Sequence, residues 1–89
     1  MNKAFLDITY QNGKPLAAYY YLGNGQGRKS KQCRELEKGL VVDYAADGTP
    51  IGIEIVDPNH LTLAAMNRVL AQLGLPKVTQ KDLEPLEAA

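Results

Sequence analysis

A glycine-rich stretch beside a basic cluster is the first place in this sequence where chemistry could be expected. Residues 22–34 are LGNGQGRKSKQCR, and three tyrosines directly precede Leu22. A dinucleotide-binding loop needs G-x-G-x-x-G at the start of a helix, and a Walker loop needs a final Gly-Lys-Ser/Thr, so neither spacing is met. We therefore interpret residues 23–27 as a hairpin loop rather than a phosphate-binding loop.

A second stretch has the spacing of a calcium-binding loop. In DYAADGTPIGIE, residues 43–54, the positions of Asp43, Asp47, Gly48 and Glu54 match ligand or turn positions of an EF-hand. The third position is an alanine, however, and β-branched residues flank the segment where an EF-hand has helices. A β-hairpin with an Asp-Gly turn explains the pattern, so we expect no metal there.

Residues suited to catalysis are few. The chain has one histidine, His60, and one cysteine, Cys33, and no hydroxyl has a base and an orienting acid at a recognisable spacing. His60 falls in a predicted turn, and Cys33 falls in a predicted strand, where a small buried or half-buried thiol is expected. We therefore expect a protein that is not an enzyme, with no catalytic residue and no cofactor.

Length and charge limit the remaining classes. With 89 residues, 10 basic and 10 acidic, the chain fits one small domain without a net field that would attract nucleic acid or anionic lipid. No apolar run approaches the roughly 20 residues needed to cross a bilayer. A single cysteine and the lack of an apolar signal segment favour a cytoplasmic protein.

In the first two thirds of the chain the side chains alternate with a period of two, as in half-buried strands. The apolar members of this pattern are Leu6, Ile8, Tyr10, Leu40, Val42, Tyr44, Ile51, Ile53 and Ile55. Asn12-Gly13 and Asp47-Gly48 lie between such runs and can adopt the positive φ angles of tight turns. A further, tyrosine-rich strand is expected over residues 17–22.

From Thr62 the apolar period becomes that of a helix. The apolar stripe consists of Leu63, Met66, Val69, Leu70 and Leu73. Thr62 can cap the N-terminus, and Gly74 can take the left-handed position that ends the helix. A second, shorter helix is expected from Thr79, where Asp82 completes an approximate capping box, and Pro85 predicts that it frays early.

The polar segment 29–38 is compatible with either a strand or a helix. Capping residues at both ends would permit a helix. Lys31 would then lie at the positive end of the helix dipole, and Glu35 and Glu37 would lie at its negative end. A polar strand is therefore favoured.

Residues 38–57, KGLVVDYAADGTPIGIEIVD, resemble the signature hairpin of a widespread small bacterial family known only as a domain of unknown function. Members of that family follow roughly the pattern PG-V-x-V-D-x-D-x-x-G-x-(V/I)-G-I-E-I. The resemblance implies a β-meander closed by a helix and brings no activity or catalytic residue. Some members look as if they accompany small toxin-like proteins, which suggests an antitoxin-type role.

We predict an α+β fold: an antiparallel β-meander of about five strands, with a C-terminal helix packed on one face and a short second helix. Residues 1–76 would form the domain, and residues 77–89 a short C-terminal helix or tail. The run IGIEIV, residues 51–56, is expected to be an exposed edge of the sheet, open to pairing with another chain.

These features favour a small protein-interaction module that forms homo-oligomers through strand edges or through a tyrosine-bearing face. The candidate interaction residues are Tyr19, Tyr21, Arg28, Lys29, Lys31 and Arg34. One alternative is an antitoxin-like partner of a small toxin, wrapped by the segment from Lys77 to Ala89. The other is a weak binder of nucleic acid or anions through the basic loop 28–34.

Overall fold

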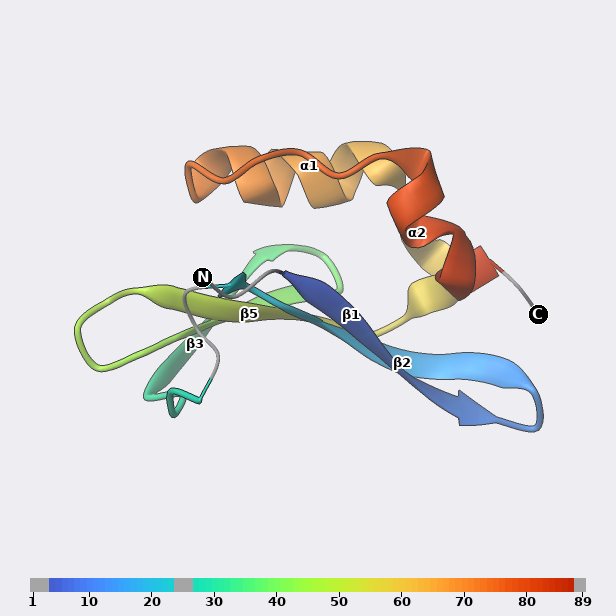
Figure 1. Ribbon diagram of the computed structural model, residues 1–89, viewed down its shortest axis with the longest axis horizontal. Helices are drawn as coiled ribbons and strands as arrows, with labels where there is room; N and C mark the ends of the chain where they lie inside the picture. The colour runs from blue at the N-terminus through green and yellow to red at the C-terminus, as the bar shows by residue number, and fades with distance from the viewer. Residues whose placement is uncertain (1–3, 24–26, 88–89) are drawn as a thin grey trace.

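The computed structural model describes residues 4–23 and 27–87, in which five strands form one antiparallel sheet. The strands are β1 (Phe5–Gln11), β2 (Lys14–Tyr21), β3 (Gln32–Glu37), β4 (Leu40–Tyr44) and β5 (Pro50–Ile55). A 3-10 helix, η2 (Pro58–His60), leads into α1 (Leu63–Gln72) and then α2 (Gln80–Glu87). Both α-helices lie on the same side of the sheet (Figure 1). The predicted α+β class is confirmed.

The strand order is β1-β2-β5-β4-β3. β3, β4 and β5 follow one another as a meander, and β5 then pairs with β2 of the N-terminal hairpin. The prediction that residues 51–56 form an exposed edge is therefore wrong, because β5 is the central strand and is hydrogen-bonded on both sides. The edges are β1 and β3, and the charged residues of β3 suit a solvated edge.

The predicted turn at Asn12-Gly13 and the predicted polar strand within residues 29–38 are confirmed. Asn12 and Gly13 adopt φ angles of 54° and 78° and connect β1 to β2. The polar segment 29–38 contains strand β3 rather than a helix. The prediction that residues 23–27 form a hairpin loop is wrong, because the strands that they connect, β2 and β3, are not paired and have β5 and β4 between them. The centre of this segment, residues 24–26, lies outside the described residues.

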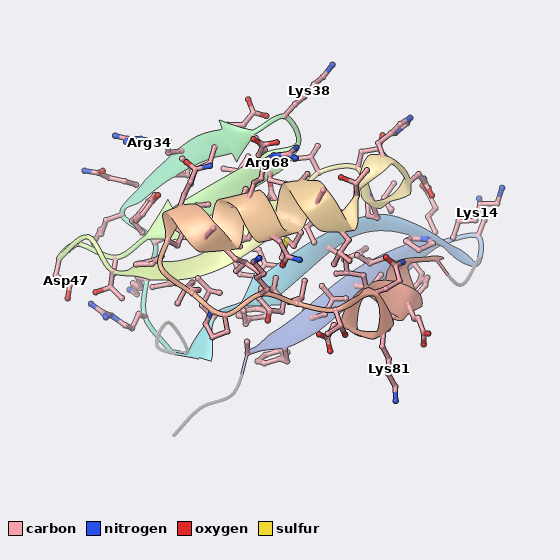
Figure 2. The ribbon with its side chains drawn as sticks, turned by 90° about the horizontal axis from the view of Figure 1, so that it is seen from above. Lys14, Arg34, Lys38, Asp47, Arg68 and Lys81 are labelled. Carbon is pink, nitrogen blue, oxygen red and sulfur yellow. The ribbon has the colours of Figure 1, made fainter. Side chains whose placement is uncertain are left out.

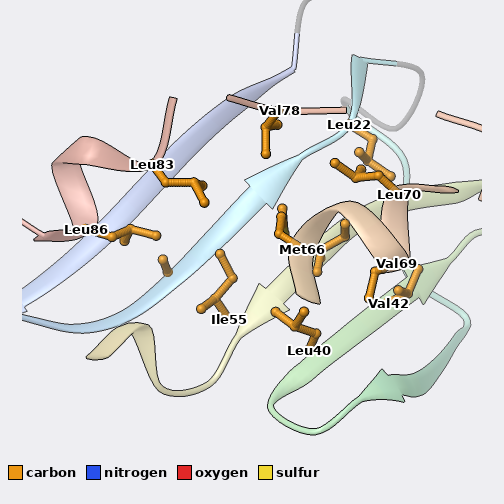
Figure 3. Packing of buried hydrophobic residues seen from close by; sticks show 12 residues of the cluster. Leu22, Leu40, Val42, Ile55, Met66, Val69, Leu70, Val78, Leu83 and Leu86 are labelled. Carbon is orange, nitrogen blue, oxygen red and sulfur yellow. The ribbon is translucent and has the colours of Figure 1, made fainter. Parts of the chain in front are cut away.

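The core lies between the sheet and α1. Met66, Val69 and Leu70 are the buried residues of α1. They pack in one cluster with buried strand residues (Figure 3), which are Ala18, Leu40, Val42, Ile53 and Ile55. Ile51 is buried but lies outside this cluster, next to a register shift in the β4–β5 pairing.

Both ends of α1 have the predicted capping. The Ala65 amide donates to Thr62 Oγ1 at 3.1 Å, which satisfies one of the first-turn donors. At the C-terminus the Leu75 amide donates to the Leu70 carbonyl at 2.9 Å, and Gly74 has a φ of 70°. This is the arrangement of a Schellman motif, and it turns the chain back over the sheet.

The segment after α1 is held against the same core. The Asn67 side chain exchanges two hydrogen bonds with the backbone of Val78, at 2.8 and 3.1 Å. Val78, Leu83 and Leu86 are all buried in the cluster that α1 covers. The prediction that Pro85 ends the second helix early is wrong, because α2 continues past it and buries Leu86. No helix within the described ranges is long and apolar enough to span a membrane.

Candidate interaction face

One face of the sheet carries no helix, and the strand register shows which residues lie on it. Residues that oppose each other directly in antiparallel strands point to the same face. Two rows therefore cross the sheet on the side away from α1 and α2. The first row is Phe5, Tyr21, Gly52, Asp43 and Cys33, and the second is Asp7, Tyr19, Glu54, Val41 and Glu35. We call these two rows the tyrosine face.

An aromatic cluster occupies the β1–β2 half of the tyrosine face. The rings of Phe5 and Tyr21 stack with centroids 4.6 Å apart and planes at 15°. The rings of Tyr19 and Tyr21 meet edge to face, also at 4.6 Å. Phe5 remains 42% exposed, whereas both tyrosines are half-buried. The structure thus brings the predicted residues Tyr19 and Tyr21 together and adds Phe5, which only the β1–β2 register could reveal.

Tyr19 crosses the central strand to reach the strand beyond it. Its hydroxyl donates to Asp43 Oδ2 at 2.7 Å, although Tyr19 lies on β2 and Asp43 on β4. Between them the ring passes over Gly52 of β5, where an added Cβ atom would overlap the Tyr19 ring. A glycine is needed at this position because a side chain cannot share the space with the ring.

Burial and the neighbouring charge both act on the Tyr19 hydroxyl. Burial raises the pKa of Tyr19 above its ordinary value of 10.0, and the hydrogen bond to Asp43 raises this pKa further. The negative charges of Asp43 and Glu54 act in the same direction. The hydroxyl therefore stays protonated at neutral pH and remains a donor to Asp43.

The tyrosine face is acidic. Asp7 and Glu54 oppose Tyr19 on either side, and Asp43 and Glu35 lie farther across the sheet. Neither row contains a lysine or an arginine. A chain with balanced overall charge thus concentrates carboxylates around its exposed aromatic cluster.

The basic candidates lie elsewhere. Arg28 pairs with Asp47 in the β4–β5 turn at 2.8 Å, and this contact lowers the pKa of Asp47. Lys29 and Lys31 are exposed in the segment before β3. Arg34 projects from the edge strand β3 (Figure 2) and opposes Val42, whose side chain lies in the helix-covered core. Two strands, β5 and β4, separate Arg34 on β3 from the tyrosines on β2, and Arg28 lies against the β4–β5 turn, so the tyrosines and the basic residues form two groups.

The histidine lies in the turn before α1, and the cysteine lies on the edge strand β3. The His60 side chain is 84% exposed, and its Nδ1 lies 2.5 Å from Asp57 Oδ2, which confirms the interpretation as a solvated turn residue. Cys33 is exposed on β3. The prediction of a buried or half-buried thiol is wrong, because β3 is an edge strand and Cys33 belongs to the uncovered face. Within residues 4–23 and 27–87, no three His, Cys, Asp or Glu side chains are grouped to hold a metal ion.

Two open clefts lie at the margins of the helix layer. One, of about 530 Å³, is lined by residues that include Tyr20, Leu73 and Asp82. The other, of about 640 Å³, lies beside η2 and includes Leu40 and His60. In the second cleft the imidazole is already paired with Asp57. Both clefts are bounded mostly by apolar residues, with Lys77 and Asp82 among the lining of the first and Glu35, Lys38 and Asp57 among that of the second.

One part of the chain matches a known protein family. Residues 17–57 match the model of a family described as a protein of unknown function (DUF2283). This range runs from β2 through β5, so the predicted resemblance to a family of unknown function is confirmed and includes Tyr19, Asp43 and Gly52. No curated protein and no solved structure matches the chain.

The pH dependence of stability tests the environment of Tyr19. Because the pKa of Tyr19 is raised in the folded protein, the unfolded chain loses this proton first as the pH rises. The free energy of unfolding contributed by Tyr19 should therefore be fully present below about pH 10 and fall at higher pH. Tyr19→Phe should make that fall shallower. The part of the fall that comes from Tyr20, whose pKa burial also raises, should remain.

The measurement is urea unfolding followed by circular dichroism at stepped alkaline pH. At neutral pH, Tyr19→Phe should also cost about 1 kcal/mol, since one hydrogen bond is lost. An unchanged alkaline slope in Tyr19→Phe would contradict the placement of the hydroxyl.

Proposed function

We propose that the protein is a non-enzymatic protein-interaction module and that it binds a partner through the tyrosine face. The observation that carries this proposal is the aromatic cluster of Phe5, Tyr19 and Tyr21 on a sheet face without a helix. Aromatic side chains gathered on an exposed surface are typical of protein interfaces. The exposed Cys33 thiol supports a location in the reducing cytoplasm.

The aromatic cluster suits binding because part of it is already ordered. Tyr19 is fixed by its hydrogen bond to Asp43, and the Tyr21 ring is held between Tyr19 and Phe5. Ordering side chains at an interface costs free energy, so rings that are fixed beforehand reduce that cost. Aromatic residues also bury a large area while only two torsions need to be ordered.

The two alternative roles fit the geometry less well. An antitoxin-like protein that wraps its toxin with the segment from Lys77 to Ala89 would have to withdraw Val78, Leu83 and Leu86 from the core. Recognition of a toxin-like partner through the tyrosine face needs no such unfolding. Nucleic-acid binding through loop 28–34 is less favoured, because one of its basic residues, Arg28, is already paired with Asp47.

A double substitution on the tyrosine face tests the proposed function. Phe5→Thr combined with Tyr21→Thr removes one exposed and one half-buried ring and introduces β-branched residues that suit a strand. The tagged wild-type chain and the tagged variant are each used to capture proteins from a lysate of the source organism. We expect the variant to capture about tenfold less, or lower still, of the proteins that the wild-type chain binds, as for loss of interface anchor residues. Quantitative mass spectrometry of the captured proteins gives the comparison.

The matched control is Tyr10→Thr. Tyr10 is 52% exposed and its hydroxyl lies near the Pro85 carbonyl of α2, so it belongs to the helix side of the sheet. The Tyr10→Thr variant should capture the same proteins as the wild-type chain, in similar amounts. Equal capture by the double variant and by wild type, with both folded by circular dichroism, would refute the proposed function.

Self-association is a second candidate function, supported by the edge strand β1. Along β1 the one charged residue is Asp7, whereas β3 carries Arg34, Glu35 and Glu37. An edge with few charges is open to pairing with the same edge of another copy. In an antiparallel β1–β1 pair with Ile8 opposite Ile8, the tyrosine faces of the two copies would lie on the same side of the joined sheet. Asp7 of one copy would then lie opposite Thr9 of the other.

Charge at residue 9 tests this edge pairing. Thr9 is exposed, so Thr9→Asp should leave the monomer folded while opposing Asp7 of the second copy, and it should weaken the dimer. Thr9→Lys should strengthen the same dimer. Size-exclusion chromatography with light scattering measures both changes. A wild-type chain that stays monomeric at high concentration would exclude self-association.

A further inference from the structure

We propose that the partner presents an arginine-bearing basic segment to the tyrosine face, an inference that rests on the proposed function. The strand register alternates rings with carboxylates on this face. The negative charge of these carboxylates restricts what can cover the aromatic cluster.

Carboxylates and rings alternate at the spacing of the strands. Asp7, Tyr19 and Glu54 oppose one another on three neighbouring strands, β1, β2 and β5. Since adjacent strands lie about 4.8 Å apart, the backbone positions of Asp7 and Glu54 are roughly 10 Å apart, with the Tyr19 position between them. In the other row, Asp43 accepts a hydrogen bond from the Tyr19 hydroxyl. The negative charge of Asp43 remains at the margin of the aromatic cluster.

The charge of the tyrosine face excludes several occupants. The rows hold four carboxylates, from Asp7, Glu35, Asp43 and Glu54, and no described lysine or arginine. A nucleic-acid backbone or an anionic lipid surface would be repelled. A second copy stacked face to face would bring like charges together, which is unfavourable in an interface. A cationic segment complements the face.

Arginine matches this alternation better than lysine does. A guanidinium group is planar, stacks on aromatic rings, and can donate two parallel hydrogen bonds to one carboxylate. A ring beside a carboxylate therefore offers both contacts to one side chain. Lysine provides the charge but not the planar fork.

The test uses a short peptide of alternating arginine and glycine as the probe, with lysine and glutamate versions of the same length. The ¹⁵N-labelled protein is titrated at low salt and followed by NMR. We expect the arginine peptide to shift amide signals of the two rows, to bind about threefold or more tightly than the lysine peptide, and to weaken with added salt. The glutamate peptide should shift none of these signals.

Neutralising one carboxylate on the face and one away from it provides the matched control. Glu54→Gln should lower the affinity for the arginine peptide by about threefold, the effect of losing one exposed ion pair. Glu84→Gln is the same change at an exposed position of α2 and should leave the affinity unchanged. Equal effects of the two substitutions would overturn the inference, as would shifts confined to α2 or equal shifts by the glutamate peptide.

Failure of this inference can be separated from failure of the proposed function. If capture depends on Phe5 and Tyr21 but is insensitive to Glu54→Gln and to salt, the face binds a partner that is not basic, and only the inference fails. If the face pairs with a second copy, self-association will strengthen in Glu54→Gln and with added salt, because both changes relieve repulsion between like charges, and the inference fails as well. Capture that does not depend on Phe5 and Tyr21 refutes the proposed function itself.

Discussion

The hydrogen bond from the Tyr19 hydroxyl to Asp43 Oδ2 spans an entire strand, because β5 lies between the two residues. The ring can cross that strand only where β5 has no side chain, and Gly52 supplies this gap. The contact therefore ties three neighbouring strands together on the face that no helix covers. It also fixes the ring against which Tyr21 packs, so the order of the aromatic cluster depends on one glycine.

The two faces of the sheet differ in what covers them. On the helix side, Met66 and Leu70 of α1 and Leu83 of α2 close the core. Burial of such side chains is the main source of folding free energy in a domain of this size. The other face stays open and combines aromatic rings with carboxylates, so its residues can serve binding without being required for the core. This division explains how a chain of 89 residues can remain folded while it exposes aromatic surface.

The local pattern of the sequence was sufficient to predict the elements. Alternation predicted the strands, the change of period at Thr62 predicted α1, and glycine with its neighbours predicted the turns, because each of these depends on residues close in the chain. Strand order depends on pairing between distant segments, and the isoleucine run of β5 gives no local sign of lying in the centre of the sheet rather than at its edge. The pairing of β5 with β2 was missed for that reason.

The candidate site was predictable only in part. Alternation along β2 indicated that Tyr19 and Tyr21 share a face, so both could be proposed from the sequence. The contribution of Phe5 and the role of Gly52 required the cross-strand register. The basic residues are near the tyrosines in the sequence but not in the sheet, since the chain passes from β2 to the far edge before β3 begins.

Substitution of Gly52 in two backgrounds tests the central contact most directly. In the wild-type chain, Gly52→Ala should displace the Tyr19 ring and lower the free energy of unfolding by about 1–3 kcal/mol, the cost of overpacking. In a Tyr19→Ala background the space is empty, and the same substitution should be neutral or should raise stability by about 0.5–1 kcal/mol, since alanine is better than glycine within a strand. Urea unfolding of the four proteins gives both values, and an equal loss of stability in the two backgrounds would contradict the account.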